Sequence, residues 1–239
     1  MSKKNRIFER TEKKYKINKQ QQDNLLSLIK DNLTPDEHGI SEIYSLYLDN
    51  KSHLLIRNSL SEKLYKEKLR IRSYGKPDKE SFVYFEIKKK FKGVVHKRRE
   101  KLLFKEVLEY LEKNNKPIDS QIMNEIDYMF ELYGELSPSI LVKYQRVAFS
   151  VKDSPGLRLT FDSKMKYRDD DFFDEDDIDK NISDDGLIIL EIKTNGSIPL
   201  WLVKALNECN IKPSSFSKVG TAYLDILGRG GNQDAWFNY

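Results

Sequence analysis

Lys68-Leu-Arg70-Ile-Arg72 decides the fold, because its charged and apolar residues alternate one by one. In a β-strand successive side chains point to opposite faces, so this segment has three cations on one face and two aliphatic side chains on the other. The pattern recurs in Glu86-Ile-Lys88-Lys-Lys90, Arg158-Leu-Thr-Phe-Asp162 and Glu191-Ile-Lys193. The sequence therefore predicts several strands that each have one charged and one apolar face.

Two arrangements of such strands are open. In an ordinary antiparallel sheet one face packs on a core and the charged face lies in water. Three features favour closure into a barrel instead. The charged faces are mainly basic with a few glutamates, helices with apolar stripes lie between the strands, and about eight such strands occur, as in small barrels. We therefore predict an α+β protein with an antiparallel eight-stranded closed tunnel barrel, a charged lumen and helices packed outside.

The rest of the pattern predicts a single domain over residues 1–239, with a core from about 8 to 227 and a mobile tail at 228–239. Thr34-Pro35-Asp36 and Gly39 indicate a loop, because proline and glycine interrupt regular structure. Alternation predicts strands at 8–17, 43–49, 64–74, 81–90, 94–99, 140–151, 157–165 and 187–193. Apolar residues at helical spacing predict helices at 19–32, 53–58, 103–114, 120–133, 201–209 and 218–227.

Net charge is +4, but the charges are unevenly distributed. The stretch from Asp169 to Asp185 contains ten acids and one lysine, and without it the chain would carry +13. We interpret the densest part of this stretch, Asp169 to Asp177, as a solvated, mobile loop rather than a metal site, because it lacks calcium-loop spacing. The basic remainder would attract nucleic acid, anionic membrane or polyphosphorylated molecules.

The chain has one cysteine, Cys209, so it forms no disulfide with itself. Its first residues lack the apolar region of a signal peptide, and no run of about 18 apolar residues is present to span a bilayer. We therefore expect a cytoplasmic protein without a membrane span. Coupling to a membrane would then need a partner protein, which the sequence leaves unknown.

A lumen lined with cations indicates a polyanion as its ligand. Like charges repel and desolvation is costly, so such a cavity is stable only when an anion fills it. Arginine offers a planar fork for phosphate, and lysine a compact charge. Glutamates in the same cavity would be repelled by phosphate unless a divalent cation, Mn²⁺ or Mg²⁺, lay between them. This combination predicts metal-dependent triphosphate chemistry.

Several of these segments, taken in order, resemble the catalytic domain of the vacuolar transporter chaperone (VTC) polyphosphate polymerases. This family lies in the triphosphate tunnel metalloenzyme superfamily, which also contains the CYTH enzymes. The resemblance covers about residues 8–225, and each motif is weak alone but specific in this order. The matching segments are Arg10-Thr-Glu12-Lys-Lys14-Tyr15, Ser45-Leu-Tyr47-Leu-Asp49, Lys68-Leu-Arg70-Ile-Arg72-Ser-Tyr74, Glu86-Ile-Lys88, Tyr144-Gln-Arg146-Val-Ala-Phe149, Arg158-Leu-Thr-Phe-Asp162, Glu191-Ile-Lys193 and Phe216-Ser217-Lys218.

The resemblance implies a metal-dependent phosphotransferase that adds the terminal phosphate of a nucleoside triphosphate to a growing polyphosphate chain. We expect this nucleoside triphosphate to be ATP. It implies Glu191 as a metal ligand and Ser217, Lys218 and Tyr144 as phosphate-binding residues. The side chains implied to line the tunnel and act on phosphate are Lys14, Arg70, Arg72, Lys88, Arg146 and Arg158. Phosphoryl transfer needs mainly positioning and charge neutralisation, which fits a chain with three histidines in no catalytic pattern.

Further candidates complete the predicted site. We expect Glu12 to be a second metal ligand, and Arg10, Lys193 and Arg98 to bind phosphate. The alternative for Arg98 is that it belongs to a solvated basic patch. Glu86 is either a ligand in the site or the ion-pair partner of a neighbouring cation.

Arg10 departs from a pattern of the CYTH hydrolases. These relatives typically begin with Glu-x-Glu-x-Lys, and this chain has a cation at the place of the first glutamate. Losing that carboxylate should weaken water activation, which favours a polymerase.

Two other functions remain open. The first is hydrolysis of tripolyphosphate or of a nucleoside triphosphate by the same site. The second is a non-enzymatic module that binds polyphosphate or RNA. The interleaved glutamates disfavour a pure binder. RNA binding would need aromatic side chains on the basic faces, whereas we expect the aromatic residues of this chain mainly on the opposite faces. We therefore expect no nucleic-acid partner.

Overall fold

The computed structural model describes residues 11–61, 64–92, 94–172, 179–183 and 186–229. These residues form ten strands and six α-helices, which confirms the predicted α+β class. The strands are β1 (Thr11–Ile17), β2 (Leu33–Asp49), β3 (Tyr65–Tyr74), β4 (Phe82–Phe91), β5 (Val94–Leu103), β6 (Ser137–Val151), β7 (Arg158–Arg168), β8 (Lys180–Asn181), β9 (Ile188–Thr194) and β10 (Pro213–Ser214). The helices are α1 (Lys19–Ile29), α2 (Leu54–Leu60), α3 (Phe104–Lys113), α4 (Gln121–Tyr133), α5 (Leu200–Glu208) and α6 (Lys218–Arg229), and a 3-10 turn, η1 (Lys30–Asn32), follows α1.

The strands belong to one sheet, but this sheet is open by its hydrogen-bonded strand order. Its order is β10-β1-β9-β7-β6-β2-β3-β4-β5, with β8 paired to β7. The prediction of a closed eight-stranded barrel is therefore wrong: ten strands are described, and β10 and β5 end the sheet without pairing with each other. β10 has only two residues and begins with Pro213, which has no N–H to donate. Closure depends on strand tilt and stagger as well as number, and alternation of residues specifies neither.

The chain divides into two compact units built from interleaved segments. Unit 1 comprises Met1–Ile40, Arg146–Ser163 and Gly186–Phe216, and unit 2 comprises Ser41–Gln145, Lys164–Asp185 and Ser217–Tyr239. The single domain over 1–239 stays a prediction.

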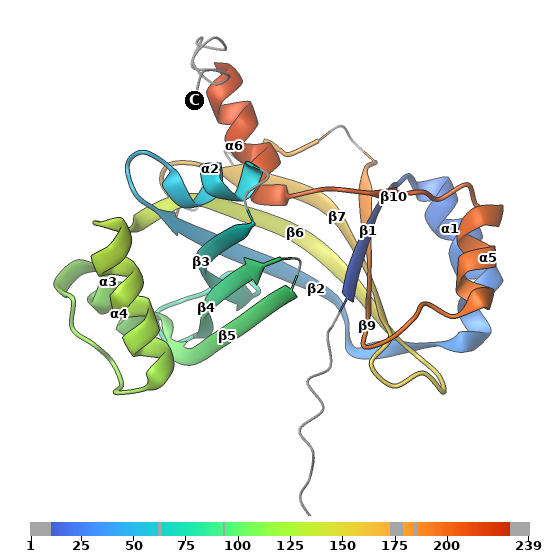
Figure 1. The fold of residues 1–239 in the computed structure, drawn as a ribbon, viewed down its shortest axis with the longest axis horizontal. Coiled ribbons are helices and arrows are strands. Elements are labelled where there is room, and N and C mark those ends of the chain that lie inside the picture. Colours follow the sequence, from blue (N-terminus) through green and yellow to red (C-terminus); the bar gives the residue numbers. More distant parts are fainter. Residues whose placement is uncertain (1–10, 62–63, 93, 173–178, 184–185, 230–239) are drawn as a thin grey trace, which may run out of the picture. The chain divides into compact units, whose positions relative to one another are not determined.

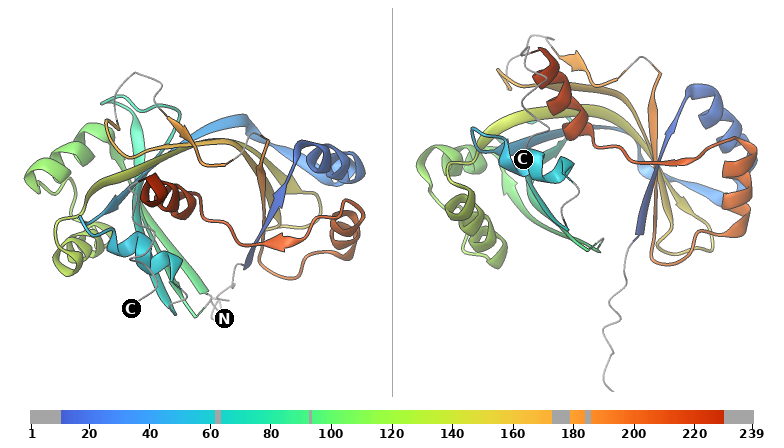
Figure 2. Two further views of the ribbon diagram at one scale, coloured as in Figure 1. Left: turned by 90° about the horizontal axis from the view of Figure 1, so that it is seen from above. Right: turned by 45° about the horizontal axis from the view of Figure 1, so that its top comes forward.

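The core of unit 1 lies between strands β1, β7 and β9 and the helices α1 and α5, which lie side by side in both views of Figure 2. Tyr15 and Ile17 of β1 are buried in this core and alternate with Lys14 and Lys16, as the sequence predicts. α1 begins at a capping box: the Asn18 side chain accepts a hydrogen bond from the Gln21 amide, and the Gln21 side chain accepts one from the Asn18 amide.

The core of unit 2 joins one face of β3, β4 and β5 to α3 and α4 (Figure 1). Leu69 and Ile71 of β3 and Phe85 of β4 are buried there beside Tyr110 of α3. Since these core positions are odd-numbered in β3 and β4, the even-numbered charged positions lie on the other face.

Several elements differ from the predicted ones in their bounds or in their presence. Residues 34–39 belong to β2 rather than to a loop, and Gly39 has a positive φ of 53° within this strand. The predicted tail at 228–239 is wrong at its first two residues, because α6 includes Gly228 and Arg229; residues 230–239 lie outside the described residues. The paired two-residue strands β8 and β10 have no sequence signal, since two residues show no periodicity.

None of the helices in the described part of the chain has the length and apolar character needed to cross a membrane. Much of the predicted mobile acidic loop, 173–177, lies outside the described residues. Asp179 lies just after this stretch, and its buried side chain pairs with Arg168 at 2.8 Å and with Lys143. This acid therefore holds β6 and β7 side chains in unit 2.

Candidate anion-binding sites

Unit 2 has a cationic face, formed by the side chains of β3, β4 and β5 that point away from α3 and α4. The strand register defines it, because directly opposed residues of an antiparallel pair lie on the same side. Arg72 opposes Tyr84, and Arg70 opposes Glu86. The described cations of this face are Lys66, Lys68, Arg70, Arg72, Lys88, Lys90, Lys97, Arg99 and Lys101.

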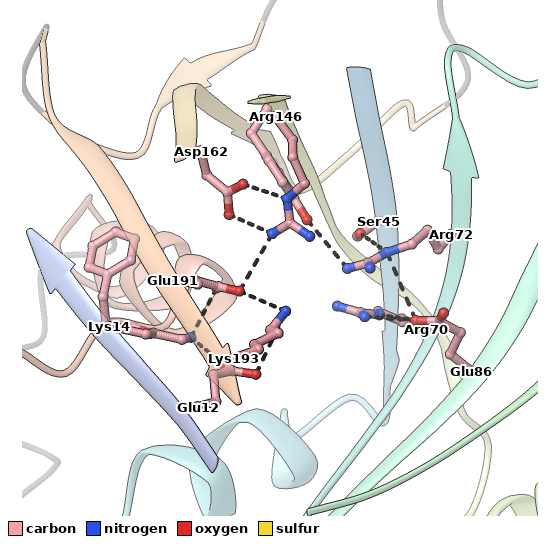
Figure 3. Close-up of polar contacts among 12 residues, drawn as sticks. Glu12, Lys14, Ser45, Arg70, Arg72, Glu86, Arg146, Asp162, Glu191 and Lys193 are labelled. Atoms are coloured by element: carbon pink, nitrogen blue, oxygen red, sulfur yellow. Dashed lines mark hydrogen bonds and ion pairs between the residues drawn. The ribbon is translucent and has the colours of Figure 1, made fainter. Parts of the chain in front are cut away.

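Glu86 is the carboxylate at the centre of the cationic face, and it is almost fully buried. Arg70 approaches its Oε2 atom with Nε at 2.8 Å and with a terminal nitrogen at 2.7 Å (Figure 3). Lys97 Nζ lies 2.5 Å from the other oxygen, and Arg72 Nε lies 3.9 Å from Oε2. Burial would raise the pKa of Glu86, but Arg70, Arg72 and Lys97 outweigh it and lower this pKa to about 2. The structure thus favours the ion-pair reading of Glu86.

Two tyrosines of unit 2 hold the arginines from the side opposite Glu86. Arg70 donates to the Tyr47 hydroxyl at 3.1 Å, and Arg72 donates to the Tyr144 hydroxyl at 3.3 Å. Arg72 also donates to Ser45 at 3.3 Å. Each guanidinium is therefore fixed in position, which reduces the conformational entropy lost when it binds an anion.

Tyr47 has an unusual electrostatic environment. Its burial opposes ionisation, but Arg70, Lys68 and Arg72 stabilise the phenolate and lower the pKa of Tyr47 to about 7. A tyrosine with a pKa this low indicates a strong positive potential on the cationic face. Sequence reasoning quoted Tyr47 within a motif and gave it no role.

The start of α6 adds to this group in unit 2. Lys68 donates to the Ser217 hydroxyl at 3.1 Å, and Ser217 accepts from the Gly220 amide at 3.2 Å. Lys218 lies 4.6 Å from the centre of the Tyr144 ring. The structure therefore brings Ser217, Lys218 and Tyr144 to the same group as Lys68 and Arg72.

Arg98 does not lie on the cationic face, so the register places it apart from the cations with which we expected it to bind phosphate. It opposes Ile87 in the register and forms an ion pair with Glu125 of α4. Its neighbour Lys97 occupies the cationic face and pairs with Glu86. Residues 96–99 are all polar, so the sequence contains no apolar residue that would mark which of them face the core.

Unit 1 holds a second charged group, in which acids and lysines of β1 and β9 alternate. The register places Lys14 opposite Glu191 and Glu12 opposite Lys193. Lys14 Nζ lies 3.6 Å from both Glu12 and Glu191, and Lys193 Nζ lies 3.0 Å from Glu191 and 3.8 Å from Glu12 (Figure 3). Lys14 also donates to the Phe216 carbonyl at 2.9 Å. Both predicted metal ligands thus share the same two lysines.

Arg146 of β6 joins this group through Asp162 of β7. Arg146 donates to both oxygens of Asp162, at 2.6 and 2.7 Å, and lies 3.6 Å from Glu191. Asp162 is fully buried. The sequence places Asp162 in a strand motif without predicting a role for it. Only the structure identifies it as the partner that orients Arg146.

One other predicted residue, Arg158, lies apart from this group. The Arg158 side chain opposes Lys193 in the register but pairs with Asp36, and 45% of its surface is exposed. Arg10 lies outside the described residues.

The residues that would hold a divalent cation are Glu12 and Glu191. Over the part of the chain that the structure describes, no group of three or more His, Cys, Asp or Glu side chains is placed to hold a metal alone. Mg²⁺ is usually bound by one or two carboxylates together with phosphate oxygens and water. Two carboxylates that share two lysines fit this pattern, because phosphate would pair with the lysines and leave the carboxylates for the metal.

The fold is that of an α+β protein with a large antiparallel sheet, and each of the two units carries a group of charged side chains. A family model, the VTC domain, matches residues 9–226, and the chain therefore belongs to the VTC domain family. The search of curated proteins returned no matching sequence.

One solved structure shows the same fold at low sequence identity, and two others are more distant. A proposed adenylate cyclase from Bacillus halodurans has a TM-score of 0.55 and 15% identity, and the alignment covers 87% of this chain and 95% of that one. A protein from Pyrococcus horikoshii has a TM-score of 0.47 and 12% identity, and the alignment covers 92% of this chain and 99% of that one. A second proposed adenylate cyclase, from Vibrio parahaemolyticus, has a TM-score of 0.47 and 13% identity, with 92% and 97% covered. The first shows the fold alone, and the other two are too distant to support a conclusion.

Proposed function

We propose that this protein is a metal-dependent polyphosphate polymerase. Its phosphate donor is a nucleoside triphosphate, which we expect to be ATP. In the reaction the bond between the terminal phosphorus and its bridging oxygen breaks. A new bond forms to a terminal oxygen of the polyphosphate chain, and the nucleoside diphosphate leaves. Membership in the VTC domain family supports this reaction class.

The observation that carries the proposal is the fixed pair Arg70 and Arg72 on the cationic face. Both guanidinium groups are held by hydrogen bonds to tyrosine hydroxyls and by Glu86. Catalysis of phosphoryl transfer consists mainly of orienting the reactants and neutralising charge on the transferred group. Fixed arginines do both, since each presents a planar fork to phosphate oxygens without first being ordered.

The other side chains have supporting roles in the proposed reaction. Lys88, Lys97 and Lys68 would neutralise the phosphate chain, and Arg146 would bind phosphate from its fixed position on Asp162. Glu12 and Glu191 would hold Mn²⁺ or Mg²⁺, which neutralises phosphate charge when bound. The acceptor is an anion at neutral pH, so the reaction needs no strong general base.

Arg10 supports synthesis over hydrolysis. The CYTH hydrolases that the chain resembles typically have a glutamate at this place, and a cation there would bind a phosphate chain instead of activating water. Hydrolysis and simple binding remain the alternative outcomes of the test below.

The test is to incubate the full chain with ATP and Mn²⁺ and to separate the products by gel electrophoresis. Long polyphosphate is the expected product. Arg70→Ala and Arg72→Ala should mostly abolish it, and Arg98→Ala is the matched control, because this cation pairs with Glu125 on the other face. Phosphate with nothing longer would mean a hydrolase, and ATP binding without any product would mean a binding module.

A further inference from the structure

Three aromatic side chains lie on the cationic face, at the end of β3 and the start of β4. They are Tyr74, Phe82 and Tyr84, and we call them the aromatic platform. Tyr84 opposes Arg72, while Val83 between Phe82 and Tyr84 is buried in the opposite, apolar face. The platform is therefore not part of the core, and Tyr74 and Phe82 are 56% and 59% exposed.

Cations of β5 surround the aromatic platform. The Arg99 guanidinium lies 4.5 Å from the centre of the Tyr84 ring, and Lys101 Nζ lies 4.0 Å from that of Phe82. Tyr74 and Tyr84 contact each other edge to face at 6.0 Å. Exposed rings arranged with arginine and lysine are the features that proteins use to stack single nucleobases.

The position of the platform matches the length of a nucleotide held by the fixed arginines. Tyr74 follows Arg72 by two residues on the same face, and Phe82 precedes Tyr84 by two. Two residues of a strand span roughly 7 Å. A ligand whose phosphates lie on Arg70 and Arg72 therefore has its nucleoside one or two such steps away, over the platform.

We propose that Tyr74, Phe82 and Tyr84 bind the nucleobase of the nucleoside triphosphate donor by stacking. The inference rests on the proposed function, which supplies the phosphates at Arg70 and Arg72, and it adds a base site beside them. Stacking uses the flat face that every base has. The site should therefore accept different nucleobases and bind purines, with their larger rings, more tightly than pyrimidines.

The test compares the binding of ATP with that of inorganic tripolyphosphate by calorimetry. The variant Tyr74→Ala/Phe82→Ala removes two exposed rings without touching the core. Loss of a base–aromatic contact costs about 1–3 kcal/mol, which corresponds to roughly 5- to 150-fold weaker ATP binding. Tripolyphosphate has no base, so its affinity should not change.

Phe91→Ala is the matched control. This ring lies on β4, as Phe82 and Tyr84 do, is 49% exposed, and contacts Tyr65 edge to face on the opposite face of the sheet. Its removal should leave the affinity for both ligands unchanged. A second variant, Tyr74→Phe/Phe82→Tyr, keeps both rings and should bind ATP like the natural protein.

Two results would overturn the inference while the proposed function stands. One is unchanged ATP affinity in Tyr74→Ala/Phe82→Ala, and the other is an equal loss for ATP and tripolyphosphate. If the natural protein binds neither ligand, the proposed function fails and the base site fails with it.

Discussion

At the scale of single residues, Glu86 is the counter-ion that allows three cations to lie together in unit 2. A charge buried without a partner costs several kcal/mol, so the cations and Glu86 depend on each other. Phosphate would bring a second source of negative charge to the same face.

Glu86→Gln should lower the free energy of unfolding by about 3 kcal/mol, because it removes the countercharge of Arg70, Arg72 and Lys97. Urea unfolding of both proteins measures this loss. Added tripolyphosphate should recover part of it by supplying negative charge, and equal stabilisation of both proteins would contradict this role of Glu86.

The stability difference between these two proteins should also depend on pH. The folded pKa of Glu86, about 2, lies below its ordinary value of 4.5. The Glu86 carboxylate therefore contributes its full stability above pH 4.5 and loses it as the pH falls toward 2. We expect the two unfolding curves to converge over that interval. A constant gap down to the lower pH would show that Glu86 is not the titrating group.

Tyr47 should ionise near pH 7 instead of 10, and its tyrosinate absorbance in the ultraviolet should report this. Because the folded pKa is the lower one, ionised Tyr47 stabilises the fold increasingly as the pH rises from 7 toward 10. Tripolyphosphate should raise this pKa by neutralising Arg70 and Lys68. Tyr47→Phe, the control, should lack the transition, and a titration near pH 10 in the natural protein would refute the prediction.

At the scale of elements, neighbouring cations of β5 point to opposite faces of the sheet. Lys97 and Arg99 lie on the cationic face, while Arg98 pairs with Glu125 of α4. A strand has a period of two, so neighbouring cations have different partners and different functions.

This arrangement predicts different effects of two adjacent substitutions. Lys97→Ala should weaken tripolyphosphate binding by roughly tenfold, the size expected for loss of one charge-assisted contact. Arg98→Ala should leave binding unchanged and lower stability by less than about 1 kcal/mol, because its ion pair is partly exposed. Calorimetry measures the affinity of both variants for tripolyphosphate, and urea unfolding measures their stability. Weaker binding by Arg98→Ala than by Lys97→Ala would mean that the register of β5 is wrong.

At the scale of the whole molecule, the positive charges outside one acidic stretch repel one another and so lower the stability of the fold. The chain carries +13 outside the acidic stretch at 169–185. Such self-repulsion destabilises a compact state, and a bound polyanion relieves it.

Tripolyphosphate at one hundred times its dissociation constant should therefore stabilise the fold by about 2.7 kcal/mol and raise the melting temperature by roughly 5–10 °C. Thermal unfolding measures this shift. Sodium chloride at the same ionic strength is the control and should give a smaller rise. Equal effects of the two salts would mean screening instead of specific binding.

Much of the site in unit 2 follows from the sequence alone. Strict alternation in β3 and β4 predicts that Arg70, Arg72 and Glu86 share a face, and the register confirms it. Lys97 was missed because residues 96–99 are uniformly polar. Asp162 and Tyr47 were quoted without a role, since a local pattern does not say which side chains meet across strands.

The sequence by itself determined the class of fold, the faces of the strands and the family, because each depends on local periodicity and on the order of motifs. Only the tertiary structure decided that the sheet is open, that Arg98 faces α4, and that Arg146 is oriented by Asp162. These features depend on register, stagger and contacts between distant segments. The period-two alternation of charged and apolar residues is compatible with more than one register, more than one stagger and more than one set of long-range contacts.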